Sequence, residues 1–199
     1  MVSLFFVVSG VGQMLSGFVV DKIGAQRVLF AALASFIVAG LVAAGAQNYF
    51  MLLLASFFAG LGNAPFHPVD FTILNKRVTA KNIGHAFSVH GISGNIGWAM
   101  APVVMLGVTT ATGSWRWACV CGAAFAATVL LIMWCNRRWL DDKAFDAQIT
   151  DAAPATQGAT TAPESQFAYL KLPVVWLCFA FFFFSTVALS VVQNYAGTA

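Results

Sequence analysis

Charged side chains are scarce in this 199-residue sequence: Asp, Glu, Lys and Arg make up 9% of it, whereas apolar residues make up 60%. A water-soluble domain could not bury so large an apolar fraction, which excludes a soluble globular fold and makes a lipid bilayer the expected solvent. The charges are also unevenly spread, because residues 1–20, 28–69, 117–136 and 172–199 contain none. A helix needs roughly 20 residues to cross the hydrocarbon core of a bilayer, and each of these runs is long enough to form one.

Catalytic and metal-binding patterns are also lacking. The four cysteines lie inside apolar runs without metal-ligand spacing, and we expect them to be small buried hydrophobes. They are Cys119, Cys121, Cys135 and Cys178. The sequence contains no P-loop, no G-x-S-x-G and no paired carboxylates at a plausible site. We therefore expect no enzymatic activity, no metal and no cofactor.

The apolar runs predict an all-α integral membrane protein. Only helices and closed barrels satisfy their backbone groups in lipid, and long runs without strict alternation exclude a barrel. Dividing the longer runs at their polar interruptions predicts about six membrane helices. Their approximate ranges are 1–20, 28–46, 49–74, 83–108, 115–135 and 172–192.

The basic residues predict the topology of these helices. The loops 21–27, 76–82 and 136–171 would lie on one side and would hold nine of the ten Lys and Arg residues, leaving Arg116 on the other. By the positive-inside rule these three loops are cytoplasmic, and the protein is a multi-pass protein of the inner or plasma membrane. The net charge of +3 follows from this bias and implies no nucleic-acid partner.

The helices are grouped unevenly along the chain. Residues 1–136 would form five membrane helices, 137–171 a polar cytoplasmic linker, and 172–199 would hold a sixth helix. Transporters are commonly built from halves of matched helix number. We therefore expect an incomplete bundle whose partners include further membrane helices, one in front of this chain and several behind it.

One charged turn has a specific spacing, Gly17-x-x-x-Asp21-Lys22-x-Gly24-x-x-Arg27. Gly17 would permit close helix contact, and Gly24 can adopt a left-handed conformation that ends a helix. Asp21 lies at a helix C-terminus, where the macrodipole disfavours an anion, so it requires a nearby cation or helix N-terminus. An ordinary charged turn is the alternative interpretation.

This turn resembles the signature G-x-x-x-D-[RK]-x-G-[RK]-x-[RK] of the major facilitator superfamily, with Ala25 where a basic residue is usual. The resemblance implies a chain covering the second to seventh helices of such a transporter, with a turn that gates alternating access. Trp115-Arg116-Trp117 is similar to the start of the family's sixth helix, and Gly91–Pro102 to the fifth helix of its antiporters.

The third predicted helix contains the only acid inside a predicted span. It reads Gly60-Leu-Gly62-Asn63-Ala-Pro65-Phe-His67-Pro68-Val-Asp70, and its part Phe-His-Pro-x-Asp resembles fosmidomycin-resistance-type efflux proteins of the same superfamily. His67 and Asp70 share a helix face, and a membrane carboxylate is costly unless it is paired or hydrated. Both are candidates for proton coupling. In the alternative interpretation, Asp70 reaches the cytoplasmic interface and serves only as a charge partner at the helix end.

Several other polar or aromatic residues in predicted spans are candidates for a substrate cavity, with helix contacts as the alternative role. They are Gln13, Asn63, His90, Asn95 and Trp98. The sequence thus predicts a secondary transporter of a small organic solute, coupled to protons and exporting by antiport. The alternatives are an uptake symporter of the same family and a non-transporting six-helix subunit or scaffold.

Overall fold

The computed structural model describes residues 1–79 and 81–137, and in addition the single positions 173, 176–177, 180–181 and 184. The chain divides into two units, Met1–Ala152 and Ala153–Ala199. Of the linker expected at 137–171, the structure describes only Arg137. Of the helix expected at 172–192, it describes only positions 173, 176–177, 180–181 and 184, which are helical. The fold below is that of the first unit.

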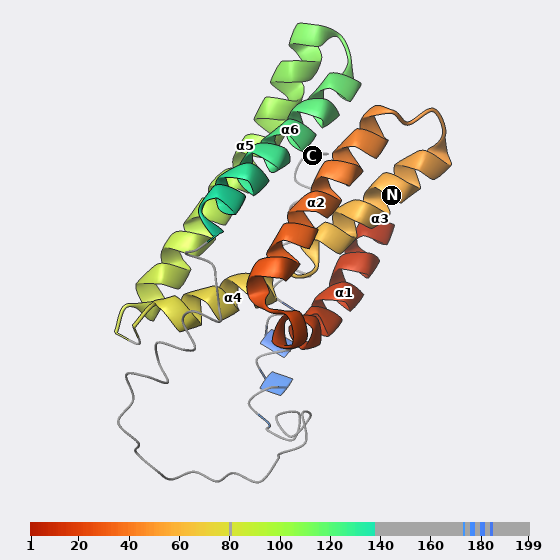
Figure 1. Cartoon of the computed structure of the whole chain (residues 1–199). Helices are drawn as coiled ribbons and strands as arrows, with labels where there is room; N and C mark the ends of the chain where they lie inside the picture. Colours follow the sequence, from red (N-terminus) through yellow and green to blue (C-terminus); the bar gives the residue numbers. More distant parts are fainter. Residues whose placement is uncertain (80, 138–172, 174–175, 178–179, 182–183, 185–199) are drawn as a thin grey trace, which may run out of the picture. The chain divides into compact units, whose positions relative to one another are not determined.

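The described part of the first unit is built from α-helices without a strand (Figure 1). In chain order they are α1 (Val2–Ile23), α2 (Ala25–Ala44), α3 (Tyr49–Asn63), α4 (Phe66–Arg77), α5 (Ile83–Thr112) and α6 (Trp115–Cys135). Five segments are long and apolar enough to cross a membrane, because α3 and α4 together form one span, Tyr49–Arg77. The predicted all-α membrane fold class is therefore confirmed.

Two glycines allow helices to end where the chain reverses. Gly24 has φ 90° and ψ 147°, and its N–H donates to the carbonyl of Val20 at 2.8 Å. A residue with a side chain rarely adopts such a φ, so Gly24 alone separates α1 from α2. The expected seven-residue turn 21–27 is thus mostly helical in the structure.

At the other end of the bundle, α5 continues to Thr112, four residues beyond the expected limit of 108. The hydroxyls of Thr110 and Thr112 donate to carbonyls one turn earlier in α5, which satisfies the polar side chains within the helix. Gly113, with φ 70° and ψ 8°, then provides the left-handed cap.

Close backbone approaches at glycines bring α1, α2, α3 and α6 together. A Cβ at Gly62 on α3 would lie 2.9 Å from the carbonyl oxygen of Ala32 on α2. A Cβ at Gly60 would lie 2.7 Å from the carbonyl oxygen of Phe5 on α1, and one at Gly40 would lie 2.9 Å from the Cβ of Ala123 on α6. Small residues permit such approaches, which replace the hydrophobic driving force that lipid does not supply.

A cluster of buried apolar residues lies where α1, α2 and α4 meet near Gly24. Its members are Val20, Ala25, Val28, Leu29, Leu33 and Val69. Val69 is fully buried, which fixes the face that α4 turns toward α1 and α2. Large apolar side chains elsewhere remain exposed, as expected for surfaces that contact lipid or other membrane helices.

The expected close packing at Gly17 and along the glycines of α5 is not found among the described residues. No atom lies within 4 Å of a Cβ built at Gly17, Gly91, Gly94 or Gly97. No residue of α5 is buried, and α5 contacts mainly α6 and, less extensively, α4. The close contacts instead form at Gly40, Gly60 and Gly62, for which close helix packing was not predicted.

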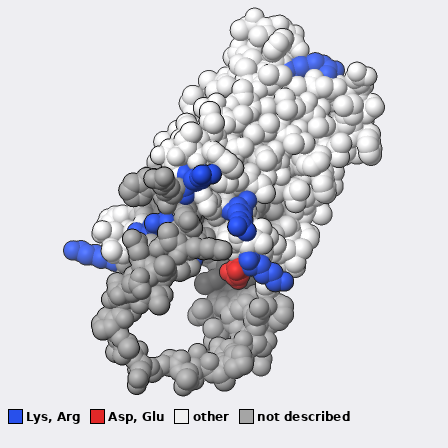
Figure 2. Space-filling model, in the orientation of Figure 1, with Lys and Arg blue, Asp and Glu red and all other residues white. Residues whose placement is uncertain are grey.

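Basic residues occur mainly at one end of the described bundle (Figure 2). Lys22 and Arg27 flank Gly24, while Lys76 and Arg77 lie in the last turn of α4. At the opposite end, the Arg116 guanidinium donates to the carbonyl of Ala44 at 2.7 Å. Arg116 thereby satisfies a carbonyl that the end of α2 leaves without a helical partner.

We predict that Gly62→Ala lowers the thermal unfolding midpoint of the whole membrane protein in detergent. Its methyl group would meet a backbone oxygen that cannot move independently, and overpacking of this kind costs roughly 1–3 kcal/mol. The matched control is Gly10→Ala on α1, where nothing lies within 4 Å of the new methyl group. Equal midpoints for the two variants would contradict the close α2–α3 contact.

Candidate functional site

The candidate site lies where the span Tyr49–Arg77 is interrupted between α3 and α4. Pro65 and Pro68 lack the N–H groups that would bond to the carbonyls of Leu61 and Ala64 in a continuous helix. The helix resumes at Phe66, and the N–H of Val69 donates to the carbonyl of Pro65 at 2.9 Å. Carbonyls freed in this way inside a membrane need other donors, and that of Ala64, a buried residue, accepts from the Ser16 hydroxyl on α1 at 3.5 Å.

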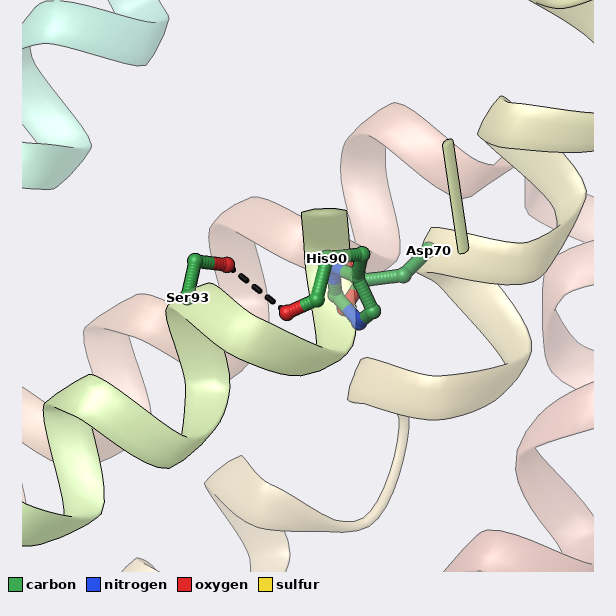
Figure 3. A network of polar contacts seen from close by, with 3 residues as sticks. All are labelled: Asp70, His90 and Ser93. Atoms are coloured by element: carbon green, nitrogen blue, oxygen red, sulfur yellow. Dashed lines mark hydrogen bonds and ion pairs between the residues drawn. The ribbon is translucent and has the colours of Figure 1, made fainter. Parts of the chain in front are cut away.

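Asp70 on α4 pairs with His90 on α5 (Figure 3). The distance from Asp70 Oδ2 to His90 Nε2 is 3.5 Å, and the two side chains are 24% and 36% exposed. Asp70 follows the fully buried Val69, so α4 turns Val69 toward α1 and α2 and Asp70 toward α5. The pair therefore joins two consecutive spans at the partly open edge of the bundle.

The neighbouring His90 helps to explain how a carboxylate can lie within a membrane span. An isolated charge inside a bilayer costs several kcal/mol, and a protonated histidine nearby offsets part of that cost. Because both side chains remain partly exposed, water or a solute can also reach them. The arrangement can hold a proton, release it, or bind a polar group of a solute.

His67 lies one turn before Asp70 on α4, and its side chain is exposed. Its ring centroid lies 5.8 Å from that of Phe71, which in turn makes an edge-to-face contact with Phe87 at 5.2 Å. This last contact also connects α4 to α5. Three aromatic rings thus lie beside the Asp70–His90 pair.

Asn63 makes a contact between α3 and α1. Its amide nitrogen donates to Ser9 Oγ at 2.7 Å, and Ser9 is 5% exposed. Gln13, one turn further along α1, has an exposed side chain, while its carbonyl accepts from the hydroxyl of Ser16 at 2.8 Å. The structure therefore engages Asn63 in helix packing and leaves the Gln13 side chain at the surface of the described bundle.

Asn95 and Trp98 do not lie with the Asp70–His90 pair. At about 100° per residue, Asn95 is turned about 140° from His90 around α5, and Trp98 about 80°. Trp98 is 74% exposed, and Asn95 is also exposed. Of the residues proposed for a cavity, the structure brings only His90 to Asp70.

The charged segment around Gly24 lies at the end of the bundle, next to the apolar cluster that contains Val69. Asp21 and Lys22 occupy the last turn of α1 and Arg27 the first turn of α2, all with exposed side chains. The Gln26 amide donates to the carbonyl of Arg137 at 3.0 Å, which links the start of α2 to the chain just after α6. This contact is not predictable from the sequence, because it depends on how α2 and α6 pack.

The Asp70–His90 pairing was also missed, although the sequence carried a signal for it. Consecutive spans run antiparallel across a short loop, and residues 70 and 90 are equally distant from position 80. Two ionisable residues at matched depths on neighbouring helices are natural partners. Within the described residues, no group of three or more His, Cys, Asp or Glu side chains could hold a metal ion.

Residues 1–198 match the Major Facilitator Superfamily, and the chain belongs to this family of membrane transport proteins. It is 29% identical over 151 residues to the "Probable 4-methylmuconolactone transporter" of Cupriavidus pinatubonensis, covering 74% of this chain and 35% of that protein. It is 29% identical over 122 residues to the "Putative multidrug resistance protein MdtD" of Serratia proteamaculans, covering 59% and 25% respectively. A third relative is "Solute carrier family 22 member 7" of Rattus norvegicus, at 25% identity over 139 residues, covering 68% and 25%.

The chain thus spans about a third or less of the length of these relatives. Family membership and the five apolar spans together make it part of a multi-pass membrane protein. The narrower resemblance to fosmidomycin-resistance-type proteins stays a prediction.

We predict that the Asn63–Ser9 hydrogen bond couples α3 to α1. Asn63→Ala and Ser9→Ala should each lower the unfolding free energy. The loss of unfolding free energy in the double variant should be smaller than the sum of the two single losses by about 0.6 kcal/mol, the usual size of such bonds in membranes. The measurement is a double-mutant cycle of unfolding on the whole protein.

The control for this cycle combines Asn63→Ala with Ser35→Ala, since the Ser35 hydroxyl bonds within its own helix. Their effects should add. A coupling energy no larger for Ser9 than for Ser35 would rule out the interhelical bond.

Proposed function

We propose that this chain is part of a secondary active transporter that moves a small organic solute by alternating access, with protons as the coupling ion and with export by antiport. The observation that carries the proposal is the Asp70 carboxylate, which lies 3.5 Å from His90 beside a break in the span Tyr49–Arg77. A broken membrane helix with an ionisable residue is a typical setting for coupling-ion and solute sites.

Antiport requires that a proton and the solute compete for the same site. Asp70 is the proposed proton carrier, with His67 as a neighbour on the same helix. As a carboxylate, Asp70 attracts a cationic group of the solute; as a neutral carboxylic acid, it loses this attraction and can itself donate a hydrogen bond. Partial exposure of Asp70 leaves room for this exchange.

The proposed topology places the basic end of the bundle in the cytoplasm of a cell with an inner or plasma membrane. The loops 21–27, 76–82 and 136–171 lie on that side, in agreement with the gathering of Lys and Arg at one end of the described helices. Arg116 at the opposite end would then face outward.

The segment Gly17–Arg27 is the proposed gate. Asp21, Lys22 and Arg27 are exposed at the cytoplasmic end, where they can form ion pairs with other helices of the whole transporter. Gly24 supplies the tight connection between α1 and α2, and the Gln26–Arg137 bond ties this connection to the end of α6. A charged, glycine-hinged connection of this kind suits a conformational role.

The names of the relatives favour a small organic solute, since one names a lactone and another multidrug resistance. Gln13, Asn95 and Trp98 are proposed to contribute to the solute cavity of the whole protein, because each presents an exposed side chain inside a span. Vesicles of opposite orientation test the direction of transport.

We predict that Asp70→Asn abolishes proton-coupled transport by the whole protein without reducing its amount in the membrane. Asparagine keeps the size of the side chain but cannot exchange a proton. The assay is solute-induced collapse of a pH gradient in inverted membrane vesicles, with 4-methylmuconolactone and the cationic dye ethidium as test solutes. The matched variant Asp70→Glu retains a carboxyl group and should keep part of the response.

Undiminished transport in Asp70→Asn would remove this residue from the mechanism. A response seen in right-side-out vesicles, but not in inverted ones, would favour uptake over export.

A further inference from the structure

We propose that Asp70 and His90 form a proton-controlled latch between α4 and α5, which holds α5 against α4 only while Asp70 is a carboxylate and His90 is a cation. The latch rests on the proposed function, because it assigns a conformational consequence to the proton that Asp70 carries. It makes His90 the positioning residue for the coupling step.

The geometry is that of an ion pair. The 3.5 Å between Asp70 Oδ2 and His90 Nε2 exceeds an ordinary hydrogen bond but is short enough for strong attraction between opposite charges. The two groups come from different helices, so their attraction acts between α4 and α5. Loss of either charge removes most of it.

The two sides of the pair are anchored differently. On α4, the neighbouring Val69 is fully buried in the apolar cluster with Val20 and Leu29, which ties this helix to α1 and α2. On α5, no residue is buried. The main contact of α5 is with α6. Loss of the pair is therefore expected to shift α5 relative to α4, with α4 as the fixed side.

Several polar side chains of α5 bond within α5 itself in the part of the chain that the structure describes. The hydroxyls of Ser88, Ser93 and Thr110 donate to carbonyls of α5 itself; that of Ser93 donates to the carbonyl of His90 at 2.7 Å (Figure 3). An aromatic contact between the two helices is the edge-to-face pair Phe71–Phe87. This ring contact does not depend on pH, whereas the Asp70–His90 contact does.

Other ionisable groups lie on the helices that pack against α4. His67 lies one turn from Asp70 on α4, with Lys76 and Arg77 in its last turn, and α5 carries His85. On α1 and α2 the ionisable groups are Asp21, Lys22 and Arg27, which lie in the turns next to Gly24. In addition to these groups, His90 on α5 lies with its Nε2 3.5 Å from Asp70 Oδ2.

The latch predicts a bell-shaped pH dependence. At low pH the Asp70 carboxyl is protonated, and at high pH the His90 ring is neutral, so the latch is closed only between the two titrations of the coupled pair. The readout is the distance between spin labels on α2 and α5, at Ala31→Cys and Leu106→Cys, in the whole protein reconstituted in liposomes with its native cysteines replaced by alanine. Both label positions are exposed in the described bundle.

The ratio of closed to open distances should pass through a maximum as pH is varied, two- to fivefold above its value at either extreme, which is about what a partly exposed ion pair supplies. Asp70→Asn and His90→Gln should each give a flat profile. His85→Gln, on the same helix, should keep the maximum, and the exchange Asp70→His with His90→Asp should restore it.

A flat profile in the unmodified protein, a maximum in either single variant, or a flat profile in the exchanged pair would overturn the latch. These outcomes are separable from failure of the proposed function. If Asp70→Asn loses proton-coupled transport while His90→Gln keeps the maximum in the ratio of closed to open distances, the proton-coupling role of Asp70 is supported and the latch is wrong. If transport is unaffected by Asp70→Asn, the coupling role itself is wrong.

Discussion

The rest of the structure depends on the requirement that backbone and side-chain polar groups be satisfied without bulk water. A bilayer offers them no partners, so each span must be helical along almost its whole length. The requirement explains why Thr110 and Thr112 bond to carbonyls of their own helix and why Arg116 donates to the end of α2. It also explains why a membrane protein with little charge can be stable: close approach at glycines such as Gly62 supplies the packing energy.

The candidate site is the place where this requirement is relaxed. Pro65 and Pro68 interrupt the backbone bonds of the span Tyr49–Arg77, and Asp70 follows within one turn. An interrupted helix and a carboxylate are each energetically unfavourable in lipid. Where the two occur together, we expect a function that compensates for the cost. Pairing with His90 supplies part of the compensation, and the proposed exchange of a proton supplies the function.

The sequence predicted the helical membrane class because long uncharged runs leave few other folds. It also identified Asp70 as the acid within a span and Gly24 as a helix breaker, since both follow from the properties of single residues. The contacts between helices were harder to predict. Gly17 and the glycines of α5 looked suited to close packing, whereas Gly40, Gly60 and Gly62 make it, because the rotation of each helix about its axis decides which glycines face a neighbour. His67 was expected beside Asp70 from helix periodicity, but the ion pair across the loop to His90 required the relative position of two helices.

The central claim is that solute and proton compete at Asp70. The most direct test is to add a transported solute to the purified whole protein in weakly buffered detergent solution and to measure the protons released. The account predicts release from the unmodified protein and none from Asp70→Asn, even where that variant still binds the solute. Equal proton release from both proteins, or solute binding to the unmodified protein without any release, would contradict it.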